Sequence, residues 1–175
     1  MILLEDTRQQ VKKHDMKHKY FESVGVKVNR SKLYCGDYTL PTNQSVCVDT
    51  KKDIQELIGD ICGESHERFR NECIRAQESG IKLIILIEDD GGYINRRKNI
   101  YNKPVRSLDD LFGWKNPRAF IWRAGKQLYP TATKGQTLAK ACMTMQKKYG
   151  VEFVFCGSEE SGAKILELLK ASTVI

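Results

Sequence analysis

The chain has 175 residues, of which 41% are hydrophobic and 29% are charged, and its formal net charge is +7. This length predicts a single domain, residues 1–175, that can bury its own core, and the positive charge favours a polyanionic partner such as nucleic acid. No apolar run approaches the ~20 residues that a membrane helix needs, and the N-terminal stretch is too short and too acidic for a signal peptide. We therefore expect a cytoplasmic protein of a bacterial or phage-infected cell, or a nuclear protein in a eukaryote.

The first part of the sequence combines short apolar runs with one helical pattern. Residues 2–4 predict a buried strand that ends in polar residues, and such strand ends are where open α/β sheets place their sites. Residues 11–24 predict an amphipathic helix that Gly25 ends, and residues 26–33 predict a second strand. We expect the core side of this helix to carry Met16, Tyr20, Phe21 and Val24.

Residues 36–51 read GDYTLPTNQSVCVDTK and predict a β-hairpin, because two strand-like runs flank the turn residues 41–44. Side chains alternate between the two faces of a strand, so the second arm of this hairpin has two distinct faces. One face is suited to a core and the other carries polar groups: Val46, Val48 and Thr50 on the first, and Cys47, Asp49 and Lys51 on the second.

The polar face of this hairpin has the groups of a hydrolytic site. Asp49 and Lys51 lie two residues apart, and we expect the hairpin to bring Asp37 alongside them. Two carboxylates that are close enough to bind the same cation, beside a lysine, are typical of a hard-cation site that hydrolyses phosphodiesters. The alternative is a solvated strand face, because charged side chains are mostly exposed.

From Asp53 the hydrophobic period changes from two residues to 3.6, which predicts a helix with Asp53 as its N-cap and Gly63 after its end. A second helix, about 65–79, has a core side of Phe69, Cys73 and Ala76. Residues 82–87 are a continuous apolar run, typical of a strand buried on both faces. A strand, two helices and another strand form a crossover unit, so we predict an α/β fold.

The segment 91–135 is the least regular part of the sequence and the most basic. Between Arg96 and Lys134 ten basic residues stand against two acidic ones, a surplus of eight that exceeds the net charge of the whole chain. Basic residues bind phosphates and aromatic rings stack on bases, which predicts a DNA-contact surface. The alternative is an amphipathic segment packed on the core.

Within this insertion we expect most aromatic side chains to be buried and residues 91–103 to be mobile without substrate. The residues that we expect to contact DNA are Arg96, Arg97, Lys98, Lys103, Arg106, Arg118 and Arg123. The remaining sequence predicts a helix at about 138–149, a strand at 151–156 and a final helix at 159–170 with Ser158 as its cap.

Five short motifs follow one another in the first half: EDTRQ at 5–9, GDY at 36–38, CVDTK at 47–51, RFRNEC at 68–73 and LIILIE at 83–88. In this order they resemble the XPF-like (XPF/Hef-type) nuclease domain, a branch of the PD-(D/E)xK superfamily. Its corresponding motifs are Asp-x-Arg-Glu, Gly-Asp-Tyr, Val-Glu-Arg-Lys, a helix that begins Arg-Leu, and a Leu-Leu-Ile-Glu strand. The second half of the chain has no motif of this kind.

The resemblance implies a restriction-endonuclease-like fold, in which helices flank a central mixed β-sheet. It implies a metal-dependent DNA endonuclease that acts on branched or flap DNA in replication, recombination or repair, and that forms a homodimer. The tandem helix-hairpin-helix module that often follows this domain is absent, so we expect a stand-alone nuclease domain. An alternative is a non-catalytic DNA-binding module, because inactive members of nuclease pairs occur in the family.

The resemblance also implies roles for individual residues. Asp37 and Asp49 are expected to bind Mg²⁺ or Mn²⁺, with the Thr50 carbonyl as a third ligand. Lys51 is expected to orient or deprotonate the attacking water, or to neutralise the charge of the transition state. Asp6 is expected at the cleft edge, where it would help to order metal or water.

Arg8 and Arg68 are expected to contact phosphates or to pair with the acidic cluster. The sequence departs from the family pattern at three positions, with Asp49 in place of glutamate, Thr50 in place of arginine and Gln9 in place of glutamate. The acidic residue that the family has a few positions after its lysine corresponds here to either Asp53 or Glu56.

Overall fold

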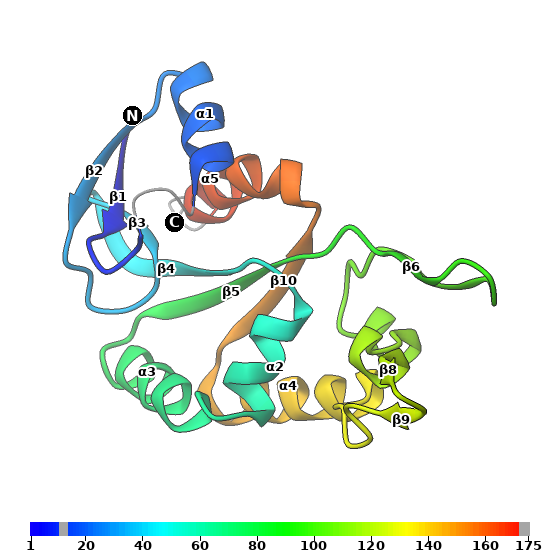
Figure 1. Ribbon diagram of the computed structural model, residues 1–175. Coiled ribbons are helices and arrows are strands. Elements are labelled where there is room, and N and C mark those ends of the chain that lie inside the picture. Colours follow the sequence, from blue (N-terminus) through cyan, green and yellow to red (C-terminus); the bar gives the residue numbers. More distant parts are fainter. Residues whose placement is uncertain (11–13, 172–175) are drawn as a thin grey trace.

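The computed structural model describes residues 1–10 and 14–171, and a six-stranded mixed sheet crosses its centre (Figure 1). The strand order is β10-β5-β4-β3-β1-β2. Strands β10, β5 and β4 are parallel to one another, as are β1 and β2, whereas β3 is antiparallel to both of its neighbours. The bounds are β1 (Ile2–Asp6), β2 (Lys27–Ser31), β3 (Tyr38–Leu40), β4 (Asn43–Lys51), β5 (Lys82–Glu88) and β10 (Glu152–Cys156).

Helices cover both faces of this sheet, as Figure 1 shows. One face packs against α1 (Asp15–Ser23) and α5 (Ser161–Ala171), and the other against α2 (Ile54–Cys62), α3 (His66–Glu78) and α4 (Gly135–Tyr149). The predicted α/β fold with a central mixed sheet flanked by helices is therefore confirmed. The predicted crossover is also present, because α2 and α3 connect the parallel strands β4 and β5.

The hairpin of β3 and β4 is present, but both faces of β4 are buried. Val46 and Val48 pack in the core beneath α1 and α5, as expected. Cys47, on the opposite face, is buried in the second core, beneath α2 and α3. The crossover helices account for the difference, because they cover the face on which Asp49 and Lys51 lie.

The first helix is shorter than predicted and only part of its expected core side is buried. Phe21 is buried, whereas Met16 and Val24 are exposed. Lys17 is buried instead, and its Nζ lies 2.5 Å from a carboxylate oxygen of Glu88 at the end of β5. The predicted start of this helix falls at residues 11–13, which lie outside the described residues.

The insertion contains two small hairpins and two short 3-10 helices. The hairpins are β6 (Gly92–Asn95) with β7 (Ile100–Asn102), and β8 (Trp122–Arg123) with β9 (Lys126–Gln127); the helices are η1 (Asp110–Gly113) and η2 (Pro117–Phe120). Leu111 and Trp114 anchor this part in the core beside α4. The expectation that most of its aromatic side chains are buried is wrong: Tyr93, Tyr101, Phe120, Trp122 and Tyr129 are exposed.

The C-terminal elements appear near their predicted positions. Gly150 ends α4 with a φ of +68°, and β10 follows. Ser158 does not cap the last helix, because it lies in the 3-10 helix η3 (Ser158–Glu160) and its hydroxyl donates to Asp90 at 2.6 Å. Among the described residues, no helix is both long and apolar enough to span a membrane.

Candidate active site

Asp37 is held at the start of β3 by a tight approach of two backbone segments. Gly36 has a φ of +69°, and a Cβ there would lie 3.0 Å from the Cβ of Cys47, so this position requires glycine. The Asp37 N–H donates to the carbonyl of Val48 at 2.8 Å. These contacts direct the Asp37 carboxylate toward the C-terminal end of β4.

The buried Asp37 carboxylate accepts hydrogen bonds from two neighbouring residues. Its Oδ2 accepts from the N–H and the hydroxyl of Thr50, at 2.9 and 2.6 Å, and its Oδ1 accepts from the side-chain amide of Gln9. The N–H and C=O of one strand residue face the same side of the strand. The Thr50 carbonyl therefore faces the side of β4 on which Asp37 lies.

Asp49 and Lys51 lie on the face of β4 that α2 and α3 cover, opposite to the face that carries Val46 and Val48. The Lys51 Nζ is 2.7 Å from Asp49 Oδ2 and 2.6 Å from Asp60 Oδ2, and all three side chains are more than 90% buried. Apart from this ion pair, Asp49 Oδ2 has no hydrogen-bond partner. Asp60 comes from α2, and the sequence analysis did not identify it.

Burial governs the protonation of these three groups. It raises the pKa of the Asp37 carboxyl, against the hydrogen bonds from Thr50. It also raises the pKa of Asp49 to about 8, against the opposing charge of Lys51. Burial alone would lower the pKa of Lys51, but the charges of Asp49 and Asp60 outweigh it and hold that pKa above its ordinary value. Lys51 is consequently a cation at neutral pH.

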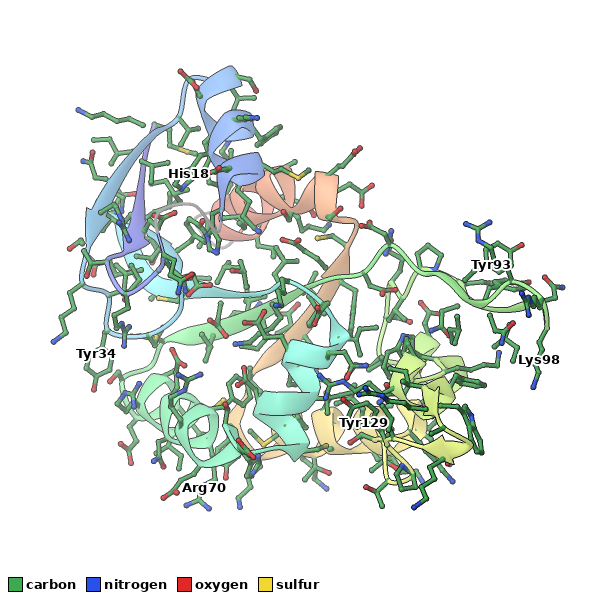
Figure 2. The ribbon with its side chains drawn as sticks, viewed as in Figure 1. His18, Tyr34, Arg70, Tyr93, Lys98 and Tyr129 are labelled. Carbon is green, nitrogen blue, oxygen red and sulfur yellow. The ribbon has the colours of Figure 1, made fainter. Side chains whose placement is uncertain are left out.

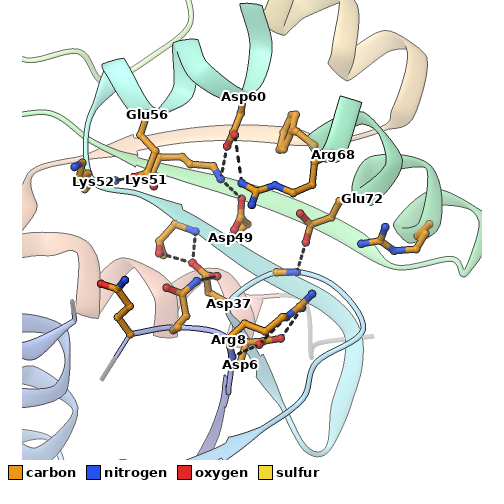
Figure 3. Close-up of a pocket in the computed structure, with 16 residues that line it drawn as sticks. Asp6, Arg8, Asp37, Asp49, Lys51, Lys52, Glu56, Asp60, Arg68 and Glu72 are labelled. Atoms are coloured by element: carbon orange, nitrogen blue, oxygen red, sulfur yellow. Dashed lines mark hydrogen bonds and ion pairs between the residues drawn. The ribbon is translucent and has the colours of Figure 1, made fainter. Parts of the chain in front are cut away.

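These groups lie in one cavity of about 540 Å³, drawn in Figure 3. Seven of the predicted site residues line this cavity: Asp6, Arg8, Asp37, Asp49, Thr50, Lys51 and Arg68. Its lining also includes charged residues that the sequence analysis did not assign to the site, namely Lys52, Asp60, Glu72 and Arg75.

Asp6 lines the cavity, and both of its oxygens are engaged. Arg8 donates to them with two side-chain nitrogens, at 2.9 and 2.6 Å, and the N–H of Leu33 donates at 3.0 Å. Burial opposes ionisation, but these bonds hold the pKa of Asp6 below its ordinary value. Arg68 has a side chain that is 83% exposed, and its nearest approach to Asp60 is 4.0 Å.

Four acidic residues have separate tasks at α2 and α3: Asp53, Glu56, Asp60 and Glu72. Asp53 caps α2 by accepting from the N–H of Glu56 at 2.7 Å, and Glu56 accepts from the N–H of Lys52 at 2.8 Å. Glu56 lines the cavity, whereas Asp60, one turn further on, pairs with Lys51. Glu72 accepts from the N–H of Gly36 at 2.8 Å and so supports the loop that carries Asp37.

The basic residues of the insertion do not line this cavity. Arg96, Arg97 and Lys98 lie at the tip of the β6–β7 hairpin, and Lys103 lies near its base. Arg118 and Arg123 belong to the η2–β9 part, where the Arg118 guanidinium lies 5.6 Å from the ring centre of Tyr129.

Arg106 is exposed, and its side chain bonds to the backbone. Its Nη1 donates to the carbonyls of Asp89 and Val105, at 2.7 and 2.8 Å. The predicted DNA-contact residues are therefore divided among the two hairpin regions and the base of the first hairpin.

The donor set of the cavity fits a hard divalent cation. Among the described residues, no three acidic, histidine or cysteine side chains cluster as metal ligands. However, Mg²⁺ needs only one or two carboxylates, with water and substrate phosphate as its other ligands. Asp37 and Asp49 supply two carboxylates, the Thr50 carbonyl supplies a third oxygen, and the buried Asp49 Oδ2 has the Lys51 ammonium as its one polar contact among the described residues.

The mixed sheet, its crossover helices and the carboxylate–lysine cavity define an α/β protein with the XPF nuclease fold. A model of the ERCC4 domain matches residues 6–169, and the chain therefore belongs to the ERCC4 domain family. No curated protein matches the sequence.

Two structures of XPF from Aeropyrum pernix are similar to this fold. The first has a TM-score of 0.61 and 18% sequence identity over 99% of this chain and 66% of that chain. The second, a complex with DNA, has a TM-score of 0.59 and 18% identity over 98% of this chain and 64% of that chain. The chain thus spans about two thirds of the length of these structures.

Proposed function

We propose that this protein is a DNA endonuclease that hydrolyses phosphodiester bonds with Mg²⁺ or Mn²⁺. One observation carries the proposal: Asp37, Asp49 and Lys51 converge in one open cavity at the C-terminal end of β4. Membership of the ERCC4 domain family and the similarity to an XPF structure in complex with DNA support it.

In this proposal Asp37, Asp49 and the Thr50 carbonyl hold the cation. Such a cation, when bound, polarises the scissile phosphate and acidifies a water molecule. Thr50 also fixes the Asp37 carboxylate through two hydrogen bonds, so this ligand needs little reorganisation. Because the pKa of Asp49 is raised to about 8, this carboxyl would have to release a proton near neutral pH before it could hold a cation.

Lys51 acts as a cation in this mechanism. Its ammonium is fixed between Asp49 and Asp60, and its raised pKa keeps it protonated at neutral pH. A protonated lysine cannot accept a proton from water, so it serves to orient the nucleophile and to stabilise the negative charge that develops on the phosphate. Asp49 and Asp60 together keep Lys51 charged and in place.

The cavity edge is suited to the phosphate backbone. Arg8 is oriented by Asp6, and Arg68 extends from α3 with most of its surface in solvent. We assign both arginines to phosphate contacts beside the cleaved bond. Asp6 thereby acts on substrate through Arg8, since its own oxygens are already bonded.

We also propose that the substrate is branched or flap DNA and that the protein is a homodimer. Exposed apolar side chains of the η2–β9 part support an interaction surface: Phe120, Ile121, Trp122, Leu128 and Tyr129. Sedimentation equilibrium measures the oligomeric state. A monomer at all concentrations would contradict the dimer and leave the nuclease proposal untouched.

A second candidate is a DNA-binding module without activity. The hydrogen bond from Gln9 to Asp37 Oδ1 favours it, because the amide occupies an oxygen that a metal ligand needs. The two readings differ in Gln9→Ala, which frees that oxygen. If the Gln9 amide is what excludes the metal, this variant gains a metal-dependent cleavage that the wild type lacks, whereas an active nuclease cleaves DNA both with and without the substitution.

The test is cleavage of labelled single-stranded, duplex, flap, fork and four-way-junction DNA with Mg²⁺, Mn²⁺ or EDTA. We expect metal-dependent cutting that is lost in Asp37→Ala, Asp49→Ala and Lys51→Ala, while all three variants remain folded. Asp15→Ala, an exposed carboxylate on α1, is the control and retains activity. Full cleavage by both Asp37→Ala and Asp49→Ala would refute the assignment.

DNA binding in EDTA separates the remaining alternatives. Affinity that falls steeply with salt and no cleavage with any metal supports the non-catalytic module. An affinity that does not depend on salt would contradict the proposed contacts between the basic residues and the DNA phosphates.

A further inference from the structure

The β6–β7 hairpin extends from the end of β5 as an arm, defined here as residues 91–103 (Figure 1). Its sequence, GGYINRRKNIYNK, contains four basic residues and no acidic one. In Figure 2, Tyr93 and Lys98 project into solvent on this arm, away from the central sheet. The arm is thus a two-stranded, positively charged ribbon outside the active-site cavity.

The base of the arm is firmly attached to the domain. The buried Asn102 side chain donates to the carbonyl of Lys115 at 2.7 Å and accepts from its N–H at 2.8 Å. Asp89 accepts from the N–H of Val105 at 2.8 Å. Gly91 has a φ of +66°, and a Cβ there would lie 2.6 Å from the carbonyl oxygen of Asn102. The two backbone segments at the base of the arm are therefore in close contact.

The tip of the arm has a defined turn that presents its basic side chains to solvent. The Asn95 side chain accepts from the N–H of Lys98 at 3.0 Å, and Asn99 adopts a φ of +50°. Arg96, Arg97 and Lys98 are all exposed, and the Arg96 guanidinium lies 5.0 Å from the ring centre of Tyr93. A base held by these bonds and a basic tip with a defined turn suit insertion into a rigid, polyanionic partner.

The arm begins close to the cavity. Lys51 pairs with Ile87 in the sheet, and Gly92 follows Ile87 by five residues, which span at most about 17 Å. The four residues of β6 add about 13 Å. With about 5 Å between the paired strands added, Arg96 at the start of the tip lies at most about 35 Å from Lys51, which is close to one helical turn of B-DNA at about 34 Å.

We propose that the arm inserts into the major groove of duplex DNA within about one helical turn of the cleaved bond. The major groove, about 12 Å wide, admits a two-stranded ribbon, and the three tip cations would then contact phosphates on its two sides. This inference rests on the proposed DNA-directed function and adds a duplex requirement to it. The arm binds the duplex, while the side chains that line the cavity hydrolyse the phosphodiester bond.

The test compares two triple variants of the full chain. The tip variant is Arg96→Ala/Arg97→Ala/Lys98→Ala. The control variant, Lys140→Ala/Lys147→Ala/Lys170→Ala, removes the same charge from exposed positions on α4 and α5. Binding is measured in EDTA on duplexes whose length increases from about 5 to 15 base pairs, and on single strands of equal length.

The tip variant is expected to lose about 10- to 100-fold in duplex affinity, and to lower the slope of log affinity against log salt by about three. The wild type should gain affinity as the duplex passes about 10 base pairs, and the tip variant should not. Duplex with glucosylated hydroxymethylcytosine, which fills the major groove, should weaken the wild type to the level of the tip variant. The control variant should follow the wild type.

Equal affinity losses in the two triple variants, or an equal loss on single strands, would overturn the inference. Insensitivity of the wild type to the groove-filling sugar would overturn it as well. A variant in which Asn-Gly replaces residues 94–100 gives an independent reading and should behave as the tip variant does. If the wild type cuts no DNA but the tip variant loses duplex binding, the arm inference stands and the proposed nuclease function fails.

Discussion

The burial of Asp49 predicts how the stability of the metal-free protein depends on pH. Desolvation raises the pKa of this carboxyl to about 8, whereas aspartate in an unfolded chain titrates near 3.9. Between these two values the folded chain keeps a proton that the unfolded chain has released. The free energy of unfolding therefore falls as pH rises through this window.

Asp49→Asn removes this titration, because an amide has no proton to release. Inside this window the free energy of unfolding falls by about 1.4 kcal/mol for each pH unit. The titration of Asp49 therefore lowers the stability of the wild type by up to about 4 kcal/mol between pH 5 and pH 8. Lys51 keeps Asp60 as a counter-ion in the variant. We expect the stability of Asp49→Asn relative to wild type to rise by up to this amount over the same range.

Urea denaturation in EDTA at pH 5, 6.5 and 8, followed by circular dichroism, measures this difference. Asp90→Asn is the matched control, because hydrogen bonds from Ser158 hold the pKa of Asp90 below its ordinary value. Asp90 is ionised in both the folded and unfolded states across this range, so its variant should differ from wild type by a constant amount. A constant difference for Asp49→Asn would refute the reasoning.

Three further predictions follow from the same site. Asp60→Asn should lower kcat by about 10- to 100-fold with little change in KM, because it removes one counter-ion of Lys51. Steady-state cleavage assays measure both constants, and an unchanged kcat would contradict this role of Asp60. Gly36→Ala should cost about 1–3 kcal/mol more than Gly25→Ala in urea denaturation, since both have a φ of +69° but only Gly36 has neighbours within 4 Å; equal costs would contradict it. Millimolar Mg²⁺ at pH 8 should raise the Tm of wild type but not of Asp49→Asn; equal shifts would exclude Asp49 as a ligand.

The fold and the centre of the site could be predicted because their signals are local. The period-two pattern before Lys51 and the 3.6-residue pattern after Asp53 define the hairpin and the helix that follow each other in the chain. In the hairpin, Asp37 and Asp49 are separated by only 12 positions. A short turn suffices to bring them to one end of β4.

Contacts between distant segments could not be predicted in this way. Lys17 is buried because Glu88, 71 positions away, supplies its counter-ion, and no local pattern reveals that pair. Asp60 could have been noticed, since it lies four residues after Glu56 on the same helical face. The support of Gly36 by Glu72 depends on how α3 packs over the sheet, which the sequence of either segment alone does not specify.

The exposed aromatic side chains of the insertion illustrate a further limit. Trp114 is buried and Trp122 is exposed, although both lie in the same basic and aromatic segment. Trp114 follows η1, which packs on α4, whereas Trp122 begins the small hairpin of β8 and β9. Whether such a ring belongs to the core is decided by the presence of a helix beneath it, not by its neighbours in the sequence.

The proposed role of Asp37 and Asp49 as ligands of one catalytic divalent cation can be tested in a single Mn²⁺ titration. Bound Mn²⁺ is counted by electron paramagnetic resonance while DNA cleavage is followed in the same samples, for wild type and Asp49→Asn. In the wild type, cleavage should rise as one ion per chain binds, and Asp49→Asn should lose both the ion and the cleavage. Wild-type cleavage in EDTA, or cleavage by Asp49→Asn at the wild-type rate, would contradict this role.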